Sequence, residues 1–322
     1  TIRRNSKTQM DRAPLIGLGA MGVFFPPRME AGMGRENFCV IAGGQRRKRL
    51  ETQGVTVNQV NYRFRVVSPE EGEPKDLIIM AVKDTGLEQA IRDIEKFVGE
   101  NTQILCVMNG VESEQKVAAV YGWDHVLYSY MRIPVELKNG TYDFDPDGGH
   151  VYFGEKENKV LSDRVKAVRD VFELCHIPYR IQEDMILGLW QKFMSNIGEN
   201  MTCALLGVPF KAFNCSSHAN AIRRMGMKEV QAVAGKLGIC LTDEMIEENC
   251  SRPFNSPYNR PSTLQDLDAG KKTEIDIFAG TVVRLGRELG VPTPANELFY
   301  HGIKVLEEKN EGKFAKNPAE ES

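Results

Sequence analysis

The sequence predicts an α/β fold in which a doubly wound sheet domain is followed by an all-helical domain. Short apolar runs alternate with amphipathic segments in the first half, whereas long helical patterns dominate after about residue 182. A glycine-rich turn also follows the first apolar run, as in nucleotide-binding sheets. A chain of 322 residues is long enough for two domains, which we assign to residues 1–182 and 183–322.

The alternation in the first domain favours a parallel sheet with helices on both faces. The amphipathic segments predicted to be helical are Thr85–Val98 and Ser113–Tyr121. The apolar runs predicted to be strands are Pro14–Gly17, Phe38–Ala42, Asp76–Val82, Gln103–Met108 and His125–Met131. The remaining strands expected are a hairpin, Val135–Leu137 and Tyr142–Phe144 around Lys138-Asn139-Gly140, followed by Gly148–Phe153.

The second domain is predicted to be helical because apolar residues recur with helical periodicity between glycine and proline breaks. Its expected helices are Asp184–Leu206, Ala219–Leu237, Asp243–Glu248, Ser262–Leu289 and Pro294–Lys309. In the last helix, Thr293 is the expected N-cap residue and Pro294 the first helical residue. The polar segment Glu311–Ser322 is expected to be frayed.

The composition is that of an ordinary globular protein, with 42% hydrophobic and 26% charged residues. A formal net charge of -3 gives no general attraction to nucleic acid or anionic lipid, and the longest apolar runs are too short to cross a membrane. The seven cysteines include no Cys-x-x-Cys pair, which favours reduced thiols and a cytoplasmic location. The five histidines lack metal-ligand spacing, so no metal site is predicted.

The cofactor signal is a Gly-x-Gly-x-x-Gly turn directly after the first predicted strand. In this motif the first glycine permits a tight turn, the second lets a pyrophosphate approach the main chain, and the third allows close helix–strand packing. The N-terminus of the next helix then faces the anion. The sequence therefore predicts a Rossmann-like, dinucleotide-binding domain. Its cofactor turn consists of Gly17, Leu18, Gly19, Ala20, Met21 and Gly22.

Three prolines make this motif irregular. Pro14 lies in the first strand and cannot donate a hydrogen bond to a sheet ladder. Pro26 and Pro27 should break or kink the early turns of the following helix. We therefore expect a locally distorted glycine turn, with weaker cofactor binding as a consequence.

The residues after the second strand favour NADP over NAD. An NAD enzyme usually carries a carboxylate about 20 positions after the glycines, which binds the ribose 2′-hydroxyl. Here Ala42-Gly43-Gly44 is followed by the basic run Gln45–Arg49, in which Arg46 is the candidate for a 2′-phosphate. The alternative is a solvated start of a basic helix. A nucleic-acid interface is not expected, because no aromatic residues are interleaved with the basic ones.

Two polar residues end neighbouring strands of the predicted sheet. Lys83 follows the strand Asp76–Val82, and Asn109 follows the strand Gln103–Met108. Ligands of open α/β sheets bind beyond the carboxyl ends of strands, so both residues are expected near the nicotinamide. The alternative is that both are ordinary polar loop residues.

The second domain offers an amine and two amides at four-residue intervals. If their segment is a helix, Lys192, Asn196 and Asn200 lie along one margin of its apolar face, since four residues return to nearly the same side. Gln191, Ser195 and Glu199 are then expected on the outward side. Such a stripe suits a polar ligand, and the alternative is a solvated helix edge.

Together with later residues, this pattern resembles the ketopantoate reductase family, the NADPH-dependent 2-dehydropantoate 2-reductases. The resemblance runs from about Pro14 to Glu308, and the order and spacing of its motifs make it specific. The residues that carry it are the glycine turn, Ala81-Val82-Lys83, Met108-Asn109-Gly110, Trp190-Gln191-Lys192 with Asn196 and Asn200, Asn259 with Ser262, Lys272–Asp276 and Gly290–Pro294.

The resemblance implies a role for each matching residue. Lys192 would be the general acid that protonates the carbonyl oxygen of the substrate while hydride arrives from NADPH. Glu274 would bind the substrate hydroxyl and adjust the environment of the lysine, and Asn109 would hold Lys192 and border the nicotinamide. The residues that would bind substrate hydroxyl and carboxylate groups are Asn196, Asn200, Asn259 and Ser262. Chemistry supports the acid independently, because hydride addition develops negative charge on oxygen and a cationic donor stabilises it.

Some positions depart from the family pattern. Gly43 replaces an arginine that often ends the second strand, and Phe210 replaces an asparagine that some members carry 18 residues beyond the lysine. Tyr130 and Arg132 lie in a segment that is small and polar in some members, and are expected to alter the pocket. These departures leave the reaction class intact and the substrate open.

The sequence therefore predicts an NADPH-dependent reductase of a small 2-keto acid. Ketopantoate is the expected substrate, and pantothenate biosynthesis is the expected pathway. Two alternatives stay open: a reductase of another small 2-keto acid, and a non-catalytic NADP-binding regulatory protein that kept the fold. No nucleic-acid or membrane partner is expected, and a homodimer stays open as an assembly.

Overall fold

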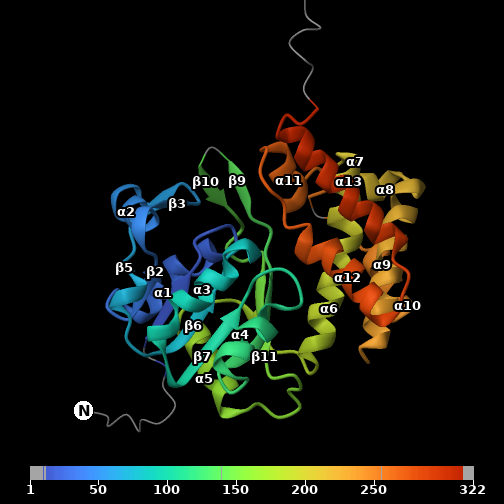
Figure 1. Ribbon diagram of the computed structural model, residues 1–322. Coiled ribbons are helices and arrows are strands. Elements are labelled where there is room, and N and C mark those ends of the chain that lie inside the picture. The colour runs from blue at the N-terminus through green and yellow to red at the C-terminus, as the bar shows by residue number, and fades with distance from the viewer. Residues whose placement is uncertain (1–9, 11, 139, 255, 315–322) are drawn as a thin grey trace, which may run out of the picture. The chain divides into compact units, whose positions relative to one another are not determined.

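The computed structural model describes residues 10, 12–138, 140–254 and 256–314, and its chain forms two compact units, Thr1–Ile186 and Leu187–Ser322. We call the first the sheet unit and the second the helical unit (Figure 1). Asn139 of the expected hairpin turn and the end of the polar tail lie outside the described residues.

Within the described residues, an eight-stranded sheet forms the centre of the sheet unit (Figure 1). Neighbouring strands pair in parallel, except that β8 and β11 are antiparallel. In spatial order the strands are β12 (Tyr179–Arg180), β11 (His150–Gly154), β8 (Val126–Arg132), β7 (Val98–Cys106), β6 (Lys75–Met80), β1 (Ala13–Ile16), β2 (Phe38–Ile41) and β5 (Val66–Val67). The predicted α/β, doubly wound fold is thereby confirmed, with one antiparallel pair that the alternation pattern did not predict.

Successive residues of the central strands belong to two hydrophobic cores, one on each face of the sheet. Leu15 and Ile79 pack in the core that contains residues of α1 (Pro26–Met33) and α5 (Asp163–Leu174). Their neighbours Ile16 and Met80 pack in the core of α3 (Leu87–Asp93) and α4 (Ser113–Tyr121). Because side chains alternate across a strand, continuous apolar strands bury both faces under helices.

The first strand accommodates its proline although it lies in the middle of the sheet. Pro14 is the second residue of β1 and is in register with Cys39 of β2. The N–H of Ala13 donates toward β2, to Asn37, so the missing N–H of Pro14 faces β6. Pairing with β6 continues on both sides of the proline, at Arg12 and at Leu15, so β1 keeps its central place without that one donor.

The predicted hairpin forms, but it belongs to a separate sheet. Strands β9 (Glu136–Lys138) and β10 (Thr141–Asp143) pair antiparallel, with Tyr142 opposite Leu137. In the described residues they extend a four-stranded sheet with β3 (Val55–Val57) and β4 (Val60–Tyr62). The remaining helical segments of the sheet unit are η1 (Gly22–Phe24), α2 (Gly44–Gln53), η2 (Pro69–Glu71), η3 (Asp84–Gly86) and η4 (Glu95–Phe97).

The helical unit contains helices with two π-helical turns among its described residues. Its elements are α6 (Met185–Asn196, which begins just before the unit), η5 (Ile197–Met201), α7 (Thr202–Leu206), α8 (Ala212–Cys215), α9 (Ser217–Lys236), α10 (Asp243–Ser251), α11 (Ser262–Asp268), η6 (Asp276–Gly280), α12 (Thr281–Leu289) and α13 (Pro294–Asn310). Helices α9, α12 and α13 pack against one another (Figure 1).

One helix prediction in this unit was wrong, and the predicted start of the last helix is confirmed with an unexpected capping group. The expected helix Ser262–Leu289 is interrupted after α11, where Gly270 takes a left-handed φ of 64°, and helix resumes only at η6. Thr293 is indeed the N-cap residue of α13, but the capping acceptor is the carboxylate of Glu229 in α9. Its two oxygens accept the N–H groups of Ala295 and Asn296 at 2.8 and 2.9 Å.

All seven cysteines lie within the described residues and are free thiols. No helix in the described part of the chain is long and apolar enough to span a bilayer.

Candidate active site

The cofactor candidates of the sheet unit share one edge of the sheet. The chain runs from β1 outward to β2 and then returns to β6 on the other side of β1, so the strand order reverses at this point. Gly17 follows β1, Lys83 follows β6 by three residues, and Asn109 follows β7 by three residues. Carboxyl ends of parallel strands meet at one edge, and α/β sheets bind ligands where the strand order reverses.

The three glycines of the turn have different surroundings. Gly17 has a φ of 101°, and a Cβ there would lie 2.5 Å from the carbonyl carbon of Ala81. A Cβ at Gly22 would lie 1.8 Å from the carbonyl oxygen of Gly17, whereas one at Gly19 would meet no described atom within 4 Å. Gly17 and Gly22 are therefore required by the fold, and Gly19 leaves open space beside the main chain. This arrangement fits a dinucleotide pyrophosphate.

The two prolines after the turn lie at the first positions of α1. The turn continues into the 3-10 segment η1, in which the N–H of Val23 donates to Gly19 at 3.0 Å. The α-helix starts only at Pro26, where the missing N–H groups have no helical partner to lose. The prolines thus separate the glycine turn from the regular helix.

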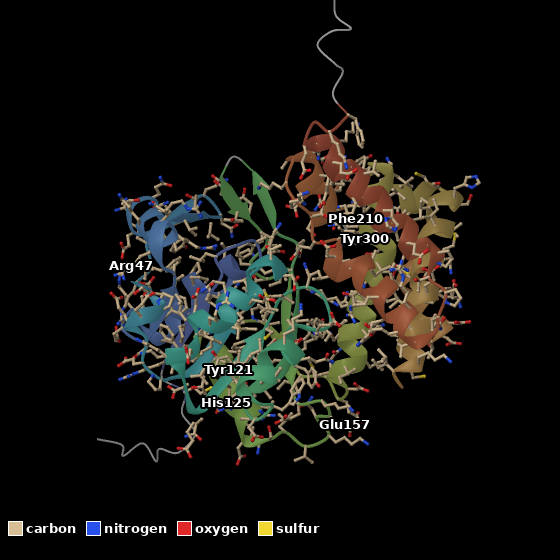
Figure 2. All side chains as sticks on the ribbon, viewed as in Figure 1. Arg47, Tyr121, His125, Glu157, Phe210 and Tyr300 are labelled. Carbon is tan, nitrogen blue, oxygen red and sulfur yellow. The ribbon has the colours of Figure 1, made fainter. Side chains whose placement is uncertain are left out.

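The arginines of the basic run in α2 differ in whether they have carboxylate partners. Arg47, labelled in Figure 2, donates to Glu51 and Glu71, both at 2.8 Å. Arg46 is exposed and forms no ion pair within the described part of the chain. Crowding by neighbouring atoms and then the charge of Arg49 lower the pKa of Arg46, so an anion placed between the two guanidinium groups would be stabilised. Arg47 is thus paired with two glutamates, whereas Arg46 forms no ion pair with the described residues.

A buried carboxylate that sequence reasoning missed supports the loop after β7. Gly110 has a φ of 94° directly after the half-buried Asn109. Glu114, which is 2% exposed, accepts the N–H of Ser129 at 3.2 Å and the hydroxyl of Ser113 at 2.9 Å. These bonds tie the loop that carries Asn109 to β8. A glutamate in the first turn of a helix ordinarily indicates an exposed residue, so its burial left no signal in the sequence.

In the helical unit, Lys192 lies in α6 and is only 7% exposed. Its neighbour Phe193 contacts Trp190 edge-on, with ring centroids 5.6 Å apart, and stacks on Phe278 of η6 at 6.3 Å. Glu274 lies four residues before Phe278, in the bend that leads into η6. The aromatic stack therefore brings the elements that carry the lysine and the glutamate against one another.

The bend that carries Glu274 is anchored to α13. Thr273 donates both its N–H and its hydroxyl to one carboxylate oxygen of Glu307, each at 2.7 Å. Both residues are buried, and the hydroxyl of Thr273 also accepts the N–H of Ile275 at 3.2 Å. The ammonium groups of Lys272 and Lys304 lie 3.7 Å from the other oxygen of Glu307. This network holds the main chain on both sides of Glu274.

The two candidate asparagines follow Lys192 along the same helical run. Asn196 ends α6 and Asn200 lies in the π turn η5, and both are half-buried. The expected outward residues Ser195 and Glu199 are instead 4% and 7% exposed. That prediction was wrong because α9 and α10 cover the side of the helical run opposite its apolar face, with polar rather than apolar partners.

The candidates Asn259 and Ser262 lie at the start of α11. Helix α11 packs against η5 and α7, so Ser262, its exposed first residue, is on an element adjacent to Asn200. The carbonyl oxygen of Asn259 accepts the N–H of Phe210 at 3.2 Å. The helical unit therefore brings the elements of Asn200, Asn259 and Ser262 together.

Phe210 and Tyr130, two residues that depart from the family pattern, lie in different surroundings. Phe210, labelled in Figure 2, stacks on Phe254 with ring centroids 4.7 Å apart, beside the segment of Asn259. Tyr130 is only 1% exposed, stacks on Tyr152 at 4.5 Å, and donates its hydroxyl to Gln182 at 2.6 Å. The side chain of Tyr130 lies in the interior, and its effect on a pocket stays a prediction.

The sheet with its glycine turn and the helical unit with its lysine define an oxidoreductase of the nicotinamide-binding class. Residues 15–158 match the family described as Ketopantoate reductase PanE/ApbA, and residues 184–307 match Ketopantoate reductase PanE/ApbA C terminal. The chain belongs to the ketopantoate reductase family.

Individual relatives are distant. A 2-dehydropantoate 2-reductase of Aquifex aeolicus is 28% identical over 240 residues, which are 72% of this chain and 76% of that protein. The solved structure of a D-mandelate dehydrogenase with NADH and anilino(oxo)acetate superposes with a TM-score of 0.82 at 22% identity, over 93% of this chain and 99% of that one. The structure of a dimeric ketopantoate reductase from Staphylococcus aureus superposes with a TM-score of 0.71 at 17% identity, over 93% of this chain and 99% of that one.

Proposed function

We propose that this protein reduces ketopantoate to pantoate with NADPH, as a step of pantothenate biosynthesis in the cytoplasm. The observation that carries the proposal is the buried Lys192, on a helix that the Phe193–Phe278 stack joins to the segment of Glu274. A buried lysine and a carboxylate on adjoining elements suit proton transfer better than they suit solubility.

The reaction adds a hydride and a proton to the ketone of the substrate. A bound nicotinamide cofactor supplies the hydride. Lys192 donates the proton to the carbonyl oxygen, where negative charge develops, so its cation stabilises the transition state. Glu274 is proposed to bind the substrate hydroxyl and to supply a negative charge that favours the protonated form of Lys192. Asn109, at the strand edge where the nicotinamide is expected, is proposed to orient the reacting groups.

The remaining site residues are assigned to binding. The amides of Asn196, Asn200 and Asn259 and the hydroxyl of Ser262 are proposed to bind the carboxylate and hydroxyl groups of the keto acid. The main chain of Gly17–Gly22 is proposed to hold the pyrophosphate, with Lys83 nearby. Arg46 is proposed to bind the 2′-phosphate, and hence to favour NADPH, since Arg47 is held by two glutamates.

The test is an absorbance assay with NADPH and a panel of 2-keto acids. Turnover of ketopantoate above all others is expected. Lys192→Ala should lower kcat by about 10²–10⁴-fold with an unchanged Kd for NADPH, because only proton transfer is removed. Lys236→Ala, which removes an exposed lysine in the last turn of α9, is the matched control and should change neither quantity. An unchanged kcat in Lys192→Ala would remove the proposed acid.

One observation favours a second candidate, a reductase of another 2-keto acid with an apolar side chain. The Phe210–Phe254 pair lies beside Asn259, where some family members carry an asparagine at the position of Phe210. The same panel decides, because preferred turnover of phenylglyoxylate over ketopantoate would select this candidate. Binding of NADPH without turnover of any keto acid would instead select a non-catalytic NADP-binding protein.

The proposed assembly is a homodimer, by analogy with the Staphylococcus aureus relative that is described as dimeric. Light scattering on the eluate of a gel-filtration column measures the mass directly. A mass near the 36.2 kDa of one chain would contradict the proposal.

A further inference from the structure

We propose that Glu199 and Arg223, with Ser195 and Asn249, are positioning residues that fix the π turn η5 and thereby aim Asn196 and Asn200 at the substrate. The inference rests on the proposed function for what the asparagines bind. Its structural part, that this buried cluster holds the turn, stands on contacts within the helical unit alone.

The first observation is the alternation of roles along the helical run. Each candidate asparagine follows directly after a buried polar residue, Ser195 before Asn196 and Glu199 before Asn200. One residue of a helix turns about 100°, so each pair presents one side chain to the candidate site and one to the interior. A fixed interior member therefore fixes the direction of its neighbour.

The second observation is that three helices hold the interior members. Arg223 of α9 is 1% exposed, and its guanidinium lies 3.9 Å from the carboxylate of Glu199. The same guanidinium donates to the carbonyl oxygen of Cys250 in α10 at 2.6 Å and lies 4.4 Å from the ring centre of Phe213 in α8. The contacts with α8 and α10 therefore fix the position of a positive charge next to the carboxylate of Glu199.

A hydrogen-bond chain holds the preceding turn in the same way. The amide of Asn249, which is 8% exposed, donates to the hydroxyl of Ser195 at 2.7 Å. That hydroxyl donates in turn to the carbonyl oxygen of Gln191 at 3.0 Å. The main chain one turn before Asn196 is thus bound to α10.

The third observation is the π turn itself, which begins directly after Asn196 and contains Asn200. In a regular α-helix four residues rotate by about 400°, so Asn200 would point about 40° beyond Asn196. A π turn is wider and rotates less per residue, which returns Asn200 toward the line of Lys192 and Asn196. The turn therefore aligns the three side chains, and π turns are rare enough to need support.

A stability role alone explains the charge pair poorly. Burying an ion pair in place of apolar residues is often neutral or unfavourable for stability, because both charges lose their hydration. Close packing around the turn is already supplied by Gly198, where a Cβ would lie 2.4 Å from the methyl of Met227 in α9. What the pair adds is a defined geometry.

The decisive variant is Glu199→Gln, which keeps the side-chain volume and removes the charge. Arg223→Met is less informative, because it removes not only the charge next to Glu199 but also the hydrogen bond to Cys250 and the contact with Phe213. The control is Glu247→Gln, since Glu247 pairs with Arg224, the residue next to Arg223, at 2.9 Å on the surface. Amide hydrogen exchange over residues 197–201 and the KM for the preferred keto acid are measured in each variant.

In Glu199→Gln we expect exchange over residues 197–201 to rise at least tenfold and KM to rise about tenfold. The Kd for NADPH should be unchanged, and Glu247→Gln should behave as wild type in every measurement. Unchanged exchange in Glu199→Gln overturns the inference, as does faster exchange with an unchanged KM, which makes the pair merely structural. Absence of any keto-acid turnover in wild type overturns the proposed function instead, and with it the substrate role of the turn.

Discussion

The two units present their candidate ligand groups by different means. In the sheet unit the proposed ligand contact is main chain, at a turn where Gly17 and Gly22 leave no room for side chains. In the helical unit the proposed contacts are side chains, Lys192 and Asn200 among them, on a helical run that packs against other helices. A site built from main chain requires particular residues, such as glycine, within one short segment. A site built from side chains also requires residues far away in the sequence that hold those side chains in place.

The difference extends to how each site is stabilised. The glycine turn is determined by close contacts among Gly17, Gly22 and Ala81, which lie within the turn and directly after β6. The turn of Asn200 depends on Arg223, and the bend of Glu274 depends on Glu307. Damage to the first site is therefore steric and abrupt, and damage to the second is graded and electrostatic.

The largest effect is expected in the glycine turn. There, Gly22→Ala tests a residue that the fold requires, and Gly19→Ala tests a residue proposed to be required for binding of the cofactor. The new Cβ of Gly22→Ala would lie 1.8 Å from a carbonyl oxygen, so we expect a loss of about 3 kcal/mol or more in the free energy of unfolding. Gly19→Ala has open space and should fold like wild type, while its methyl group obstructs a pyrophosphate. Urea denaturation and NADPH titration of both variants measure the two quantities.

Two results would contradict the view that the glycine turn is a main-chain site with strict steric requirements. One is a Gly22→Ala protein with wild-type stability, which would mean that the turn relaxes. The other is a Gly19→Ala protein with wild-type NADPH affinity, which would remove the proposed approach of the pyrophosphate to this residue.

The second effect concerns the buried carboxylate of Glu307 in the helical unit. Glu307→Gln should lower the free energy of unfolding by about 1–3 kcal/mol, because Thr273 loses a charged acceptor for two hydrogen bonds. It should also lower kcat, since the bend that carries Glu274 loosens. Glu308→Gln, which removes the half-buried partner of Lys313, is the control for both measurements. Loss of stability with an unchanged kcat would show that the hydrogen bonds between Thr273 and Glu307 stabilise the fold without affecting catalysis.

The third effect is smaller and tests side chains within the sheet unit. Arg46→Ala should raise the Kd for NADPH about tenfold, equivalent to about 1.4 kcal/mol, and leave the Kd for NADH unchanged. Arg47→Ala should change neither constant, because Glu51 and Glu71 already hold that guanidinium. Fluorescence titration with both cofactors measures the constants. Equal losses for NADPH and NADH would assign Arg46 to another part of the cofactor.

The same difference explains what could be predicted from the sequence. The glycine turn and the strands of the sheet follow from short motifs and apolar runs, because neighbours in the chain create their geometry. The burial of Ser195 and Glu199 was predicted wrongly, because their partners Asn249 and Arg223 lie on other helices. Helical periodicity identifies an apolar face and gives no sign of a second, polar one.

Interruptions of regular structure were likewise hidden in the sequence. The π turn after Asn196 has no compositional signal, and the break in the expected helix Ser262–Leu289 is marked in the sequence only by Gly270, whose φ is 64°. The cap of α13 shows the same limit, because Thr293 is the expected residue type while the acceptor, Glu229, comes from α9. Residue type predicts where a helix begins, and tertiary packing determines which group completes it.

The smallest effect concerns a charge pair of the sheet unit that is only partly buried, Glu155 and Arg164. Burial raises the pKa of Glu155, but hydrogen bonds from Arg164 and Ser162 outweigh it, so the pKa lies below its usual value of 4.5. The stabilisation is therefore fully present above about pH 4.5 and is lost as the pH falls through the lower, folded-state pKa. Glu155→Gln should show a flatter pH dependence of the free energy of unfolding in acid, and Glu157→Gln, an exposed neighbour, should match wild type. A wild-type acid slope in Glu155→Gln would mean that the acid sensitivity comes from other carboxylates, among them the buried ones of the helical unit.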